Sequence, residues 1–432
     1  MNIIGIRKEE KAFETRVPLI PKHIENLIKD YKIEFILEPS NQRAFSAEEY
    51  EKIGVKIKPL KDSQARVIIG IKEMPLDFFE KNKVYAFFSH TIKGQEHNMP
   101  MLKQIIDTSA TLLDYEKIVD EKNRRLIFFG NWAGLAGMIE ILWGFGQRVK
   151  LNNKVENPFL RIKHTWEYET LDHARKAVSD VGKEIIEKGL PKELVPLVIG
   201  FAGYGNVSRG AQEILDILPL KEITPNKIDN IQKNQSNKLI YKVVFKEEDI
   251  VEPISDDKKF NLQDYYDNPH LYRSVFHKYI DKLSILMNCI FWNKQYPRLV
   301  TKKYMEKYYN TQFKLQVIGD ISVDINGAIE FTKKATTPDK PVFVYNPIND
   351  KIIDGYKSNG CVVMAVDNLP CELPKESSQA FSNILLSFVP SIVKADFSID
   401  FNNLKLPPEI KKAVVLYHGE LTSDYSYINK FL

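Results

Sequence analysis

Ionisable side chains follow three short apolar segments in the first third of the chain. Each segment and the groups after it are 67–71 with Lys72 and Glu73, 84–88 with His90, and 110–113 with Glu116. Ligands of α/β sheets gather at the carboxyl ends of parallel strands, so we expect these side chains on one rim of a sheet. A lysine and a histidine there could exchange protons with a carbonyl or an imine, provided that burial or a neighbouring charge lowers the pKa of the lysine. The plainer alternative is a solvated lysine and a histidine that caps a helix, and the residues alone leave it open.

Two arginines near these segments could hold a carboxylate. Arg16 follows the apolar segment 2–6 and a polar loop, and Arg125 directly precedes the segment 126–129. A guanidinium group is planar and offers two parallel hydrogen bonds to a carboxylate. Either residue could instead be an ordinary surface arginine.

A glycine-rich turn follows the apolar segment 197–202 and leads into a helical pattern. The turn reads Gly203-Tyr204-Gly205-Asn206-Val207-Ser208. Its two glycines allow a sharp bend and a close approach to a pyrophosphate, which the amides at the helix start would face. Ser208 stands where a third glycine is usual, and it is small enough for strand and helix to pack closely. The order of strand, turn and helix predicts a nicotinamide dinucleotide site, and the alternative is a glycine turn that binds no nucleotide.

The choice between NAD and NADP depends on the residues about 20 positions past the glycines. An acid there binds the ribose 2′-hydroxyl of NAD, whereas a basic residue accommodates the extra phosphate of NADP. The segment 220–225 holds both kinds of residue. Glu222 could therefore serve NAD, and Lys221 could serve NADP.

Polar residues also end two later strands of the expected second sheet. Asp320 follows 315–319 and could meet the nicotinamide ribose or a substrate ammonium, or simply cap a helix. Asp367 and Asn368 follow 361–366 and could close the cofactor cleft, or form a plain turn.

These candidate residues need a framework of alternating strands and helices. In the first 130 residues the expected strands are 2–6, 33–38, 67–71, 84–88, 110–113 and 126–129, and the expected helices are 21–31, 46–53 and 97–109. Farther along, the expected helices are 131–150, 169–188, 375–393 and 407–414, and the expected strands are 197–202, 285–291, 315–319, 342–345 and 361–366. Such alternation predicts parallel α/β sheets. Residues 226–282 are polar with weak periodicity, so we expect an insertion there, with a loop at 226–240.

The composition is that of a folded protein with nearly balanced charges. Of 432 residues, 44% are hydrophobic and 27% are charged, with 61 Lys and Arg against 57 Asp and Glu, so nothing suggests a nucleic-acid partner. The three cysteines form no CxxC pair, which favours a reducing compartment and gives no reason to expect a metal site. The N-terminus is too short and too soon charged for a signal peptide, and the apolar run 126–146 contains Asn131 and Glu140. We therefore expect a cytoplasmic protein that does not enter a membrane.

Together these segments resemble the alanine dehydrogenase and transhydrogenase superfamily. The resemblance is strongest to its saccharopine branch, the lysine–2-oxoglutarate reductase half of aminoadipic semialdehyde synthase. The matching segments follow one another over nearly the whole chain, at 14–24, 70–73, 86–93, 114–117, 132–138, 203–208, 320–322 and 367–370. The run Phe-Phe-Ser-His-Thr-Ile-Lys at 87–93 is specific to this branch, whereas the glycine turn is shared more widely.

The resemblance implies two Rossmann-like α/β domains with a cleft between them. Residues 1–130 and 371–432 would form a discontinuous substrate-binding domain, and residues 131–370 would form the dinucleotide-binding domain. The roles that it implies are catalysis by Lys72 and His90, carboxylate binding by Arg16, and substrate contacts by Glu73, Glu116 and Arg125.

The implied reaction joins L-lysine to 2-oxoglutarate and reduces the imine with NAD(P)H to saccharopine, reversibly, in lysine metabolism. Lys72 would take the proton from the incoming amine, and His90 would act as general acid and base on the carbinolamine. Relatives of this branch often use NADPH, which favours NADP over NAD.

Other expectations depend on the same resemblance. The chain ends at Leu432 without a second catalytic half, so a separate glutamate-forming saccharopine dehydrogenase is expected in the same pathway. The alternatives are another amino-acid dehydrogenase of the superfamily, such as alanine dehydrogenase, and a dinucleotide-binding regulator without catalysis. The physiological direction and the oligomeric state stay open.

Overall fold

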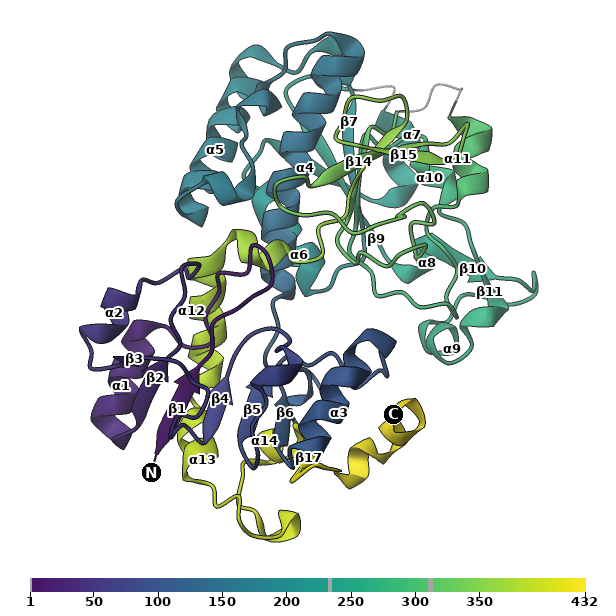
Figure 1. The fold of residues 1–432 in the computed structure, drawn as a ribbon. Helices are drawn as coiled ribbons and strands as arrows, with labels where there is room; N and C mark the ends of the chain where they lie inside the picture. Colours follow the sequence, from purple (N-terminus) through teal and green to yellow (C-terminus); the bar gives the residue numbers. More distant parts are fainter. Residues whose placement is uncertain (1, 232–234, 310–313) are drawn as a thin grey trace. The chain divides into compact units, whose positions relative to one another are not determined.

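The computed structural model describes residues 2–231, 235–309 and 314–432, and it divides the chain into two compact units (Figure 1). Unit 1 consists of Met1–Phe129 and Pro374–Leu432, and unit 2 consists of Gly130–Leu373. The chain therefore passes between the units twice. Both crossing points lie within three residues of the boundaries expected from the sequence.

Unit 1 contains one mostly parallel sheet of eight strands. The strands are β1 (Ile3–Ile6), β2 (Glu34–Leu37), β3 (Lys56–Ile57), β4 (Val67–Ile69), β5 (Val84–Phe87), β6 (Thr111–Asp114), β17 (Val414–Tyr417) and β18 (Glu420–Leu421). Their order is β3-β2-β1-β4-β5-β6-β17-β18; the first six are parallel, and the last two are antiparallel additions at the β6 edge. The helices are α1 (Pro21–Tyr31), α2 (Ala47–Glu51), α3 (Met99–Asp107), α12 (Pro374–Leu385), α13 (Val389–Lys394) and α14 (Pro408–Lys412).

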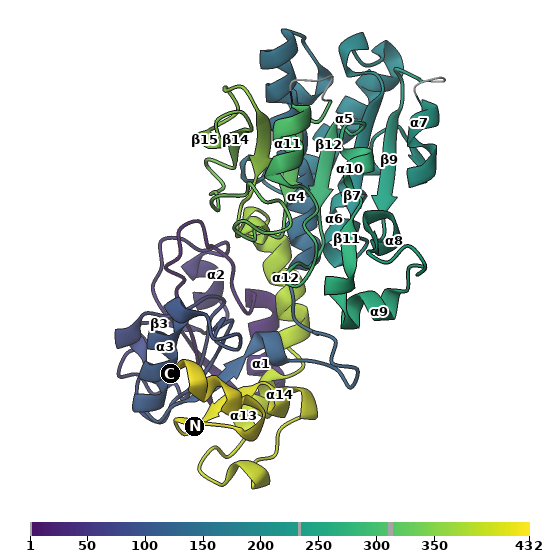
Figure 2. The same ribbon diagram turned by 90° about the vertical axis from the view of Figure 1, so that its right-hand side faces the viewer.

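Unit 2 contains a second sheet of eight strands. These are β7 (Leu197–Ala202), β8 (Leu220–Ile223), β9 (Ile240–Phe245), β12 (Ile285–Asn288), β13 (Val317–Asp320), β14 (Val342–Asn346), β15 (Lys351–Asp354) and β16 (Cys361–Met364). Their order is β8-β9-β7-β12-β13-β16-β14-β15, in which only β14 and β15 are antiparallel to their neighbours. Figure 2 shows β12, β7 and β9 side by side. The expected α/β class with two Rossmann-like parallel sheets is confirmed.

Helices and one small hairpin complete unit 2. They are α4 (Gly130–Asn153), α5 (Leu171–Lys188), α6 (Asn206–Leu215), α7 (Ile228–Ile231), α8 (Glu247–Ile250), α9 (Leu262–Asp267), α10 (His277–Ile280), α11 (Lys302–Tyr308), β10 (Val251–Pro253) and β11 (Tyr272–Ser274). Alternate side chains of β7 enter two separate hydrophobic cores. Leu197 and Ile199 pack with α4, α5 and α6 on one face of the sheet, and Val198 packs in the core on the other face. The central strand is thus covered on both faces, as its continuous apolar sequence predicts.

Local signals explain the bounds of two helices in unit 1. Pro21 occupies the first position of α1, where its missing N–H costs nothing, and Lys32 ends the helix in the left-handed conformation with a φ of 56°. Ser46 and Glu49 form a reciprocal capping box at the start of α2, because each side chain accepts the backbone N–H of the other residue.

Helices α4 and α6 approach each other very closely through two glycines. A Cβ atom on Gly134 would lie 1.9 Å from the carbonyl oxygen of Val207, and one on Gly210 would lie 2.1 Å from that of Asn131. No larger side chain fits at either glycine without moving a helix. This contact fixes the start of α6, where the glycine turn ends.

Three expectations about secondary structure were wrong. Residues 126–129 form no strand; they are apolar because Ile127 is buried and Phe129 stacks on Phe381, with ring centroids 5.1 Å apart. The segment 375–393 is two helices, since Pro390 cannot continue α12. The segment 407–414 is helical only to Lys412, and β17 starts at Val414.

The segment 226–282 is only partly an insertion. It contains β9, which lies inside the sheet between β7 and β8. Lys242 in the middle of this strand weakens its apolar pattern, but the lysine is buried and forms ion pairs with Asp216 and Glu222 at 2.8 and 2.9 Å. Residues 232–234 of the expected loop lie outside the described residues. Among the helices that the structure describes, none is long and apolar enough to cross a membrane.

Candidate active site

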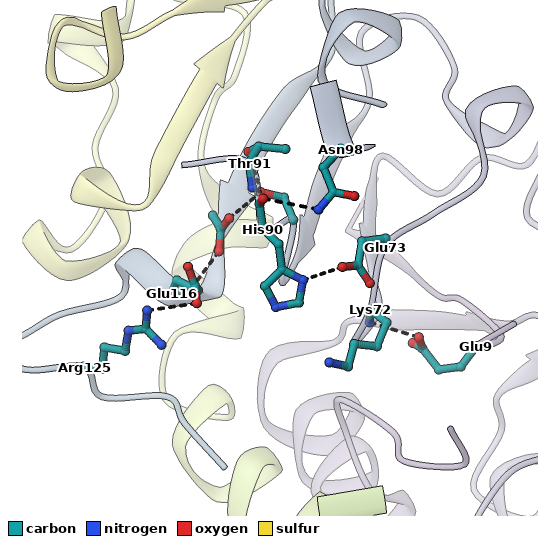
Figure 3. Close-up of polar contacts among 10 residues, drawn as sticks. Glu9, Lys72, Glu73, His90, Thr91, Asn98, Glu116 and Arg125 are labelled. Atoms are coloured by element: carbon teal, nitrogen blue, oxygen red, sulfur yellow. Dashed lines mark hydrogen bonds and ion pairs between the residues drawn. The ribbon is translucent and has the colours of Figure 1, made fainter. Parts of the chain in front are cut away.

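The carboxyl ends of β1 and β4 form the switch point of the unit 1 sheet, where α/β proteins commonly bind ligands. Glu9 follows β1 and spans this point: its Oε1 accepts the N–H of Ile71 at 2.6 Å, and its Oε2 accepts the N–H of Lys72 at 3.0 Å (Figure 3). Burial and the charge of Glu14 raise the pKa of Glu9 to about 7. Glu9 thus fixes the backbone of the turn that carries Lys72.

Lys72 is partly buried at this rim. Burial is the largest cause that lowers its pKa, and the positive charges of Arg16 and Lys11 lower it further, against the opposing charges of Glu14 and Glu73. A lysine that exchanges protons near neutral pH needs such a shift. The environment of Lys72 therefore favours the neutral amine more than water does.

His90 follows β5 and pairs with Glu73. Its Nδ1 forms a short hydrogen bond with Glu73 Oε1 (Figure 3). Burial acts to raise the pKa of Glu73, but the hydrogen bond and the charge of His90 outweigh it and bring the pKa down to about 2. Glu73 therefore remains an anion and directs Nε2 of the imidazole away from itself, while its charge also acts on Lys72.

A buried polar cluster holds the backbone of His90 in place. Ser89 donates a short hydrogen bond to the Asp114 carboxylate at the end of β6, and Asp114 also accepts the N–H of Glu116 at 2.8 Å. Asn98 donates from Nδ2 to the carbonyl oxygen of His90 at 3.3 Å. His90 itself has a φ of 50°, an unfavourable conformation for a residue other than glycine. The surrounding contacts are what maintain it.

The two arginines expected to hold carboxylates are placed differently. Arg16 is buried, with its guanidinium 4.1 Å from the Phe129 ring centroid, and it donates from Nε and Nη2 to both carboxylate oxygens of Glu14. Arg125 is exposed and donates to Glu116 Oε1 at 2.9 Å (Figure 3). A substrate carboxylate would have to share the guanidinium of Arg16 with Glu14, whereas Arg125 has exposed donors.

The Glu116–Arg125 pair lies on the wall of a cavity of about 320 Å³. The C-terminal segment of unit 1 contributes Lys412, Asp424 and Tyr425 to the same wall. Positive and negative side chains thus surround one small volume, which suits a ligand that carries both charges.

The structure joins Glu73 to His90 and Glu116 to Arg125 by hydrogen bonds, and Lys72 lies within reach of the charge of Glu73. Sequence reasoning missed Glu9 and the role of Glu14 as the partner of Arg16. The signal for Glu9 was an acid within three residues of the first strand. Its carboxylate, however, binds backbone amides, and no residue pattern predicts that role.

The glycine turn of unit 2 has the geometry of an anion cradle. Gly203 has a φ of 91°, and its N–H donates to the carbonyl oxygen of Phe245 at 3.0 Å. A Cβ atom built on Gly205 would meet nothing within 4 Å, so there is open space at the start of α6. Backbone amides at such an open helix start suit a pyrophosphate, and these residues fit a dinucleotide.

The other residues of this motif have distinct surroundings. Tyr204 is exposed and donates its hydroxyl to Glu247 at 3.1 Å. Asn206 and Val207 are the first residues of α6. Ser208 is buried, and its Oγ accepts Nε2 of Gln212 at 3.0 Å, in keeping with the close packing expected of a small side chain there.

The remaining cofactor candidates lie on three different strands. Asp320, at the end of β13, is buried and accepts from Asn288 Nδ2 at 2.8 Å and from the Thr332 hydroxyl, and burial raises its pKa to about 6. Its carboxylate is used inside the protein and caps no helix. Asp367 is exposed and Asn368 is buried, just after β16. Glu222 lies on the edge strand β8 in its ion pair with Lys242.

Two family models match the chain, namely "Alanine dehydrogenase/PNT, N-terminal domain" over residues 5–136 and "Alanine dehydrogenase/PNT, C-terminal domain" over residues 272–424. Alpha-aminoadipic semialdehyde synthase of Arabidopsis thaliana is 39% identical, over 99% of this chain and 41% of that protein. "Alpha-aminoadipic semialdehyde synthase, mitochondrial" of Rattus norvegicus is 34% identical, over 99% of this chain and 48% of that protein. The chain thus spans less than half the length of these two relatives.

Shorter relatives and solved structures agree with this result. "Saccharopine dehydrogenase (NAD(+), L-lysine-forming)" of Neurospora crassa is 27% identical over 89% of each chain. The fold matches an L-alanine dehydrogenase with a TM-score of 0.63 at 15% identity, over 99% of both chains. It also matches a transhydrogenase from Sinorhizobium meliloti with a TM-score of 0.58 at 14% identity, over 97% of this chain and 100% of that one. The chain therefore belongs to the alanine dehydrogenase/PNT family, in the branch of the aminoadipic semialdehyde synthases and the L-lysine-forming saccharopine dehydrogenases.

Proposed function

We propose that this protein is a lysine–2-oxoglutarate reductase that condenses L-lysine with 2-oxoglutarate and reduces the resulting imine to saccharopine. The observation that carries the proposal is the group formed by Lys72, Glu73 and His90, in which His90 is hydrogen-bonded to Glu73 and the charge of Glu73 acts on Lys72, whose pKa is lowered mainly by burial. Such a group can move protons at both an amine and a hydroxyl. The similarity to the synthases over the whole chain supports the choice of substrates.

Lys72 acts first in this proposal. The ε-amine of L-lysine must lose a proton before it can attack the ketone of 2-oxoglutarate. The neutral amine of Lys72, which its burial favours, accepts that proton. Glu73 stays anionic beside it and stabilises the ammonium that forms.

His90 acts on the carbinolamine. The hydroxyl group must leave as water, and the imidazolium of His90 donates the proton from Nε2, since Nδ1 is bound to Glu73. A bound NAD(P)H supplies the hydride that reduces the imine.

The substrate carboxylates need cationic partners in unit 1. We assign them to Arg125, which is exposed, and to Arg16, which would share its guanidinium between Glu14 and the substrate. We also assign the substrate ammonium groups to Glu73 and to Glu116, which accepts a hydrogen bond from Arg125.

NADP(H) is the cofactor in this proposal, in preference to NAD(H), and Asp320, Asp367 and Asn368 lie at strand ends where they can support the cofactor. We also place the reaction in the cytoplasm, in keeping with three free cysteines. Fractionation of the source cells tests the compartment, which matters because two rodent relatives carry the name mitochondrial.

The decisive experiment is a steady-state assay of NAD(P)H oxidation in which L-lysine and 2-oxoglutarate are each omitted in turn. We expect oxidation only when both are present, with saccharopine as the product by mass spectrometry. Pyruvate with ammonia is the second arm of the assay. Activity in that arm alone would identify an alanine dehydrogenase and refute the proposal.

A further inference from the structure

The strand that lies beside the glycine strand in unit 2 is β9, although β8 comes next in the sequence. The sheet order is β8-β9-β7, so β8 is at the edge and is separated from β7 by a whole strand. In the register of β7 and β9, Ala202 is opposite Phe245, and the N–H of Gly203 donates to the carbonyl oxygen of Phe245 at 3.0 Å. Lys246 is therefore the first residue past the neighbouring strand, directly beside the glycine turn.

This position decides which side chain reads the ribose of a bound dinucleotide. In dinucleotide-binding folds, the adenosine ribose faces the carboxyl end of the strand next to the glycine strand. An acid at that place accepts the 2′-hydroxyl, and a cation there accommodates a 2′-phosphate. Glu222 is on the wrong strand for this role, and its carboxylate already pairs with Lys242 at 2.9 Å.

A cavity of about 1120 Å³ opens at the carboxyl ends of β8 and β9. Its wall includes three lysines, Lys221, Lys227 and Lys246, together with Tyr204 of the glycine turn. The side chains of these lysines are exposed, and none of them forms an ion pair with a carboxylate in the part of the chain that the structure describes. Three ammonium groups around one volume attract a phosphate dianion.

The acids near this cavity are mostly engaged inside the protein. The carboxylate of Glu247 accepts the hydroxyls of Tyr204 and Tyr266, at 3.1 and 2.7 Å. Asp249 accepts the backbone N–H of Lys246 at 2.9 Å. The exposed carboxylates of the wall are Glu222, which pairs with Lys242, and Glu248. Most of the accessible charged groups on the wall are therefore lysines.

We propose that Lys246, assisted by Lys221 and Lys227, binds the 2′-phosphate of NADP(H) in this cavity and so sets the cofactor preference in place of Glu222. The inference rests on the dinucleotide site of the proposed function and adds the residues that discriminate between the two cofactors.

Calorimetric titration of the full chain with NADP⁺ and with NAD⁺, without substrates, tests the proposal. We expect Lys246→Gln to weaken NADP⁺ binding roughly tenfold, equivalent to ~1.4 kcal/mol, and to leave NAD⁺ binding unchanged. NAD⁺ affinity also reports that each variant is folded. Lys183→Ala, which removes an exposed lysine of α5, should leave the ratio of the two dissociation constants as in the wild type.

Two results would overturn the inference. They are tighter binding of NAD⁺ than of NADP⁺ by the wild type, and an equal loss of both cofactors in Lys246→Gln. The proposed reaction fails separately, if NADP⁺ binds as expected but L-lysine and 2-oxoglutarate produce no turnover. A wild type that binds neither dinucleotide refutes both.

Discussion

The two units share a six-stranded parallel core, but they use the switch point of that core in different ways. In unit 1, Glu9 joins the ends of β1 and β4 with two hydrogen bonds to backbone amides, and Lys72 and His90 follow β4 and β5 at the rim. In unit 2, the corresponding place between β7 and β12 holds Gly203, where an added Cβ atom would lie 3.0 Å from Ile290 Cγ2 and 3.2 Å from the carbonyl oxygen of Cys289. One switch point is filled by the protein, and the other is kept clear.

In the proposed function, this difference assigns proton transfer to unit 1 and dinucleotide binding to unit 2. A proton-transfer site needs side chains held in fixed positions, which a carboxylate bonded to two amides provides. A dinucleotide site needs the backbone itself to approach the ligand, which glycine permits. Variants that remove these features from one unit at a time test the comparison.

The largest effect is expected when the reactive side chains of unit 1 are removed. Lys72→Met and His90→Gln should each lower kcat/KM by about 10²- to 10⁴-fold, the usual contribution of general acid–base catalysis. NADP⁺ binding, measured by calorimetry, should stay at the wild-type value because the glycine turn belongs to unit 2. Lys61→Met, at an exposed site of unit 1, is the control. Near-normal turnover in both variants would contradict the assignment.

A side chain in the glycine turn should damage binding instead of chemistry. Gly203→Ala forces a Cβ atom into a backbone with a φ of 91° and to within 3.0 Å of Ile290 Cγ2. We expect a loss of ~1–2 kcal/mol in the free energy of unfolding and weaker binding of NADP⁺. Gly355→Ala is a matched control, since its φ is 82° and a Cβ atom there meets nothing within 4 Å. It should lose similar stability and keep full affinity; an equal loss of affinity would show that the effect is not local.

Weakening the carboxylate at the unit 1 switch point should reduce turnover more moderately. A glutamine at position 9 can accept only one of the two N–H groups, so the turn before Lys72 loses a hydrogen bond. We expect Glu9→Gln to lower kcat roughly tenfold, the effect of one charge-assisted bond. Glu10→Gln, at the exposed neighbouring residue, is the control. Unchanged kcat in Glu9→Gln would show that the turn holds its position without this bond.

The same variant has a predicted pH signature. The pKa of Glu9 is about 7 in the folded protein and 4.5 ordinarily, so folding favours its protonated form. Its contribution to stability is full below pH 4.5 and is lost as the pH rises through 7. The free energy of unfolding of the wild type, minus that of Glu9→Gln, should therefore fall between these values and then level off. A flat difference in denaturant titrations would exclude the shift.

The smallest effect is expected at a buried acid of unit 2. Burial and the charge of Glu140 raise the pKa of Glu372 well above its ordinary value, so folding favours the protonated form of Glu372. Glu372→Gln is nearly isosteric with that form and should change the free energy of unfolding by less than ~1 kcal/mol at pH 7.

Glu140→Gln is the contrasting variant. Glu140 accepts the N–H of Thr165 at 2.6 Å and lies 2.9 Å from His164 Nδ1, so its charge is used. In thermal unfolding, the melting temperature of Glu140→Gln should be well below that of Glu372→Gln. The reverse order would mean that Glu372, and not Glu140, carries the negative charge.

Candidate residues could be located from the sequence where a strand is apolar throughout and ionisable residues follow it directly. Lys72 and His90 were identified as candidates because each follows such a strand, and the α/β class followed from the alternation of elements. The strand β9 was not identified, because the ion pairs that neutralise Lys242 come from residues far away in the chain. The position of β8 at the edge could not be predicted either, since periodicity indicates that a strand exists and not which neighbour it pairs with.

The same limit applies to the carboxylates of unit 1. Glu14 accepts hydrogen bonds from the guanidinium of Arg16, two residues along the chain. Glu9 accepts backbone N–H groups of residues more than 60 positions farther along. Residue type indicates that an acid can accept hydrogen bonds, but only the folded chain determines from which donors.

The antiparallel strand β17 has a consequence for how this protein is made. In unit 1, the free edge of β6 pairs with β17, which belongs to the C-terminal segment Pro374–Leu432. Unit 2, in contrast, is one continuous stretch of chain. During synthesis the middle of the polypeptide can therefore mature before its beginning does, and the early strands must wait with an open edge that invites association with other chains. Slowing translation after residue 373 should prolong that vulnerable interval and increase the demand for chaperones.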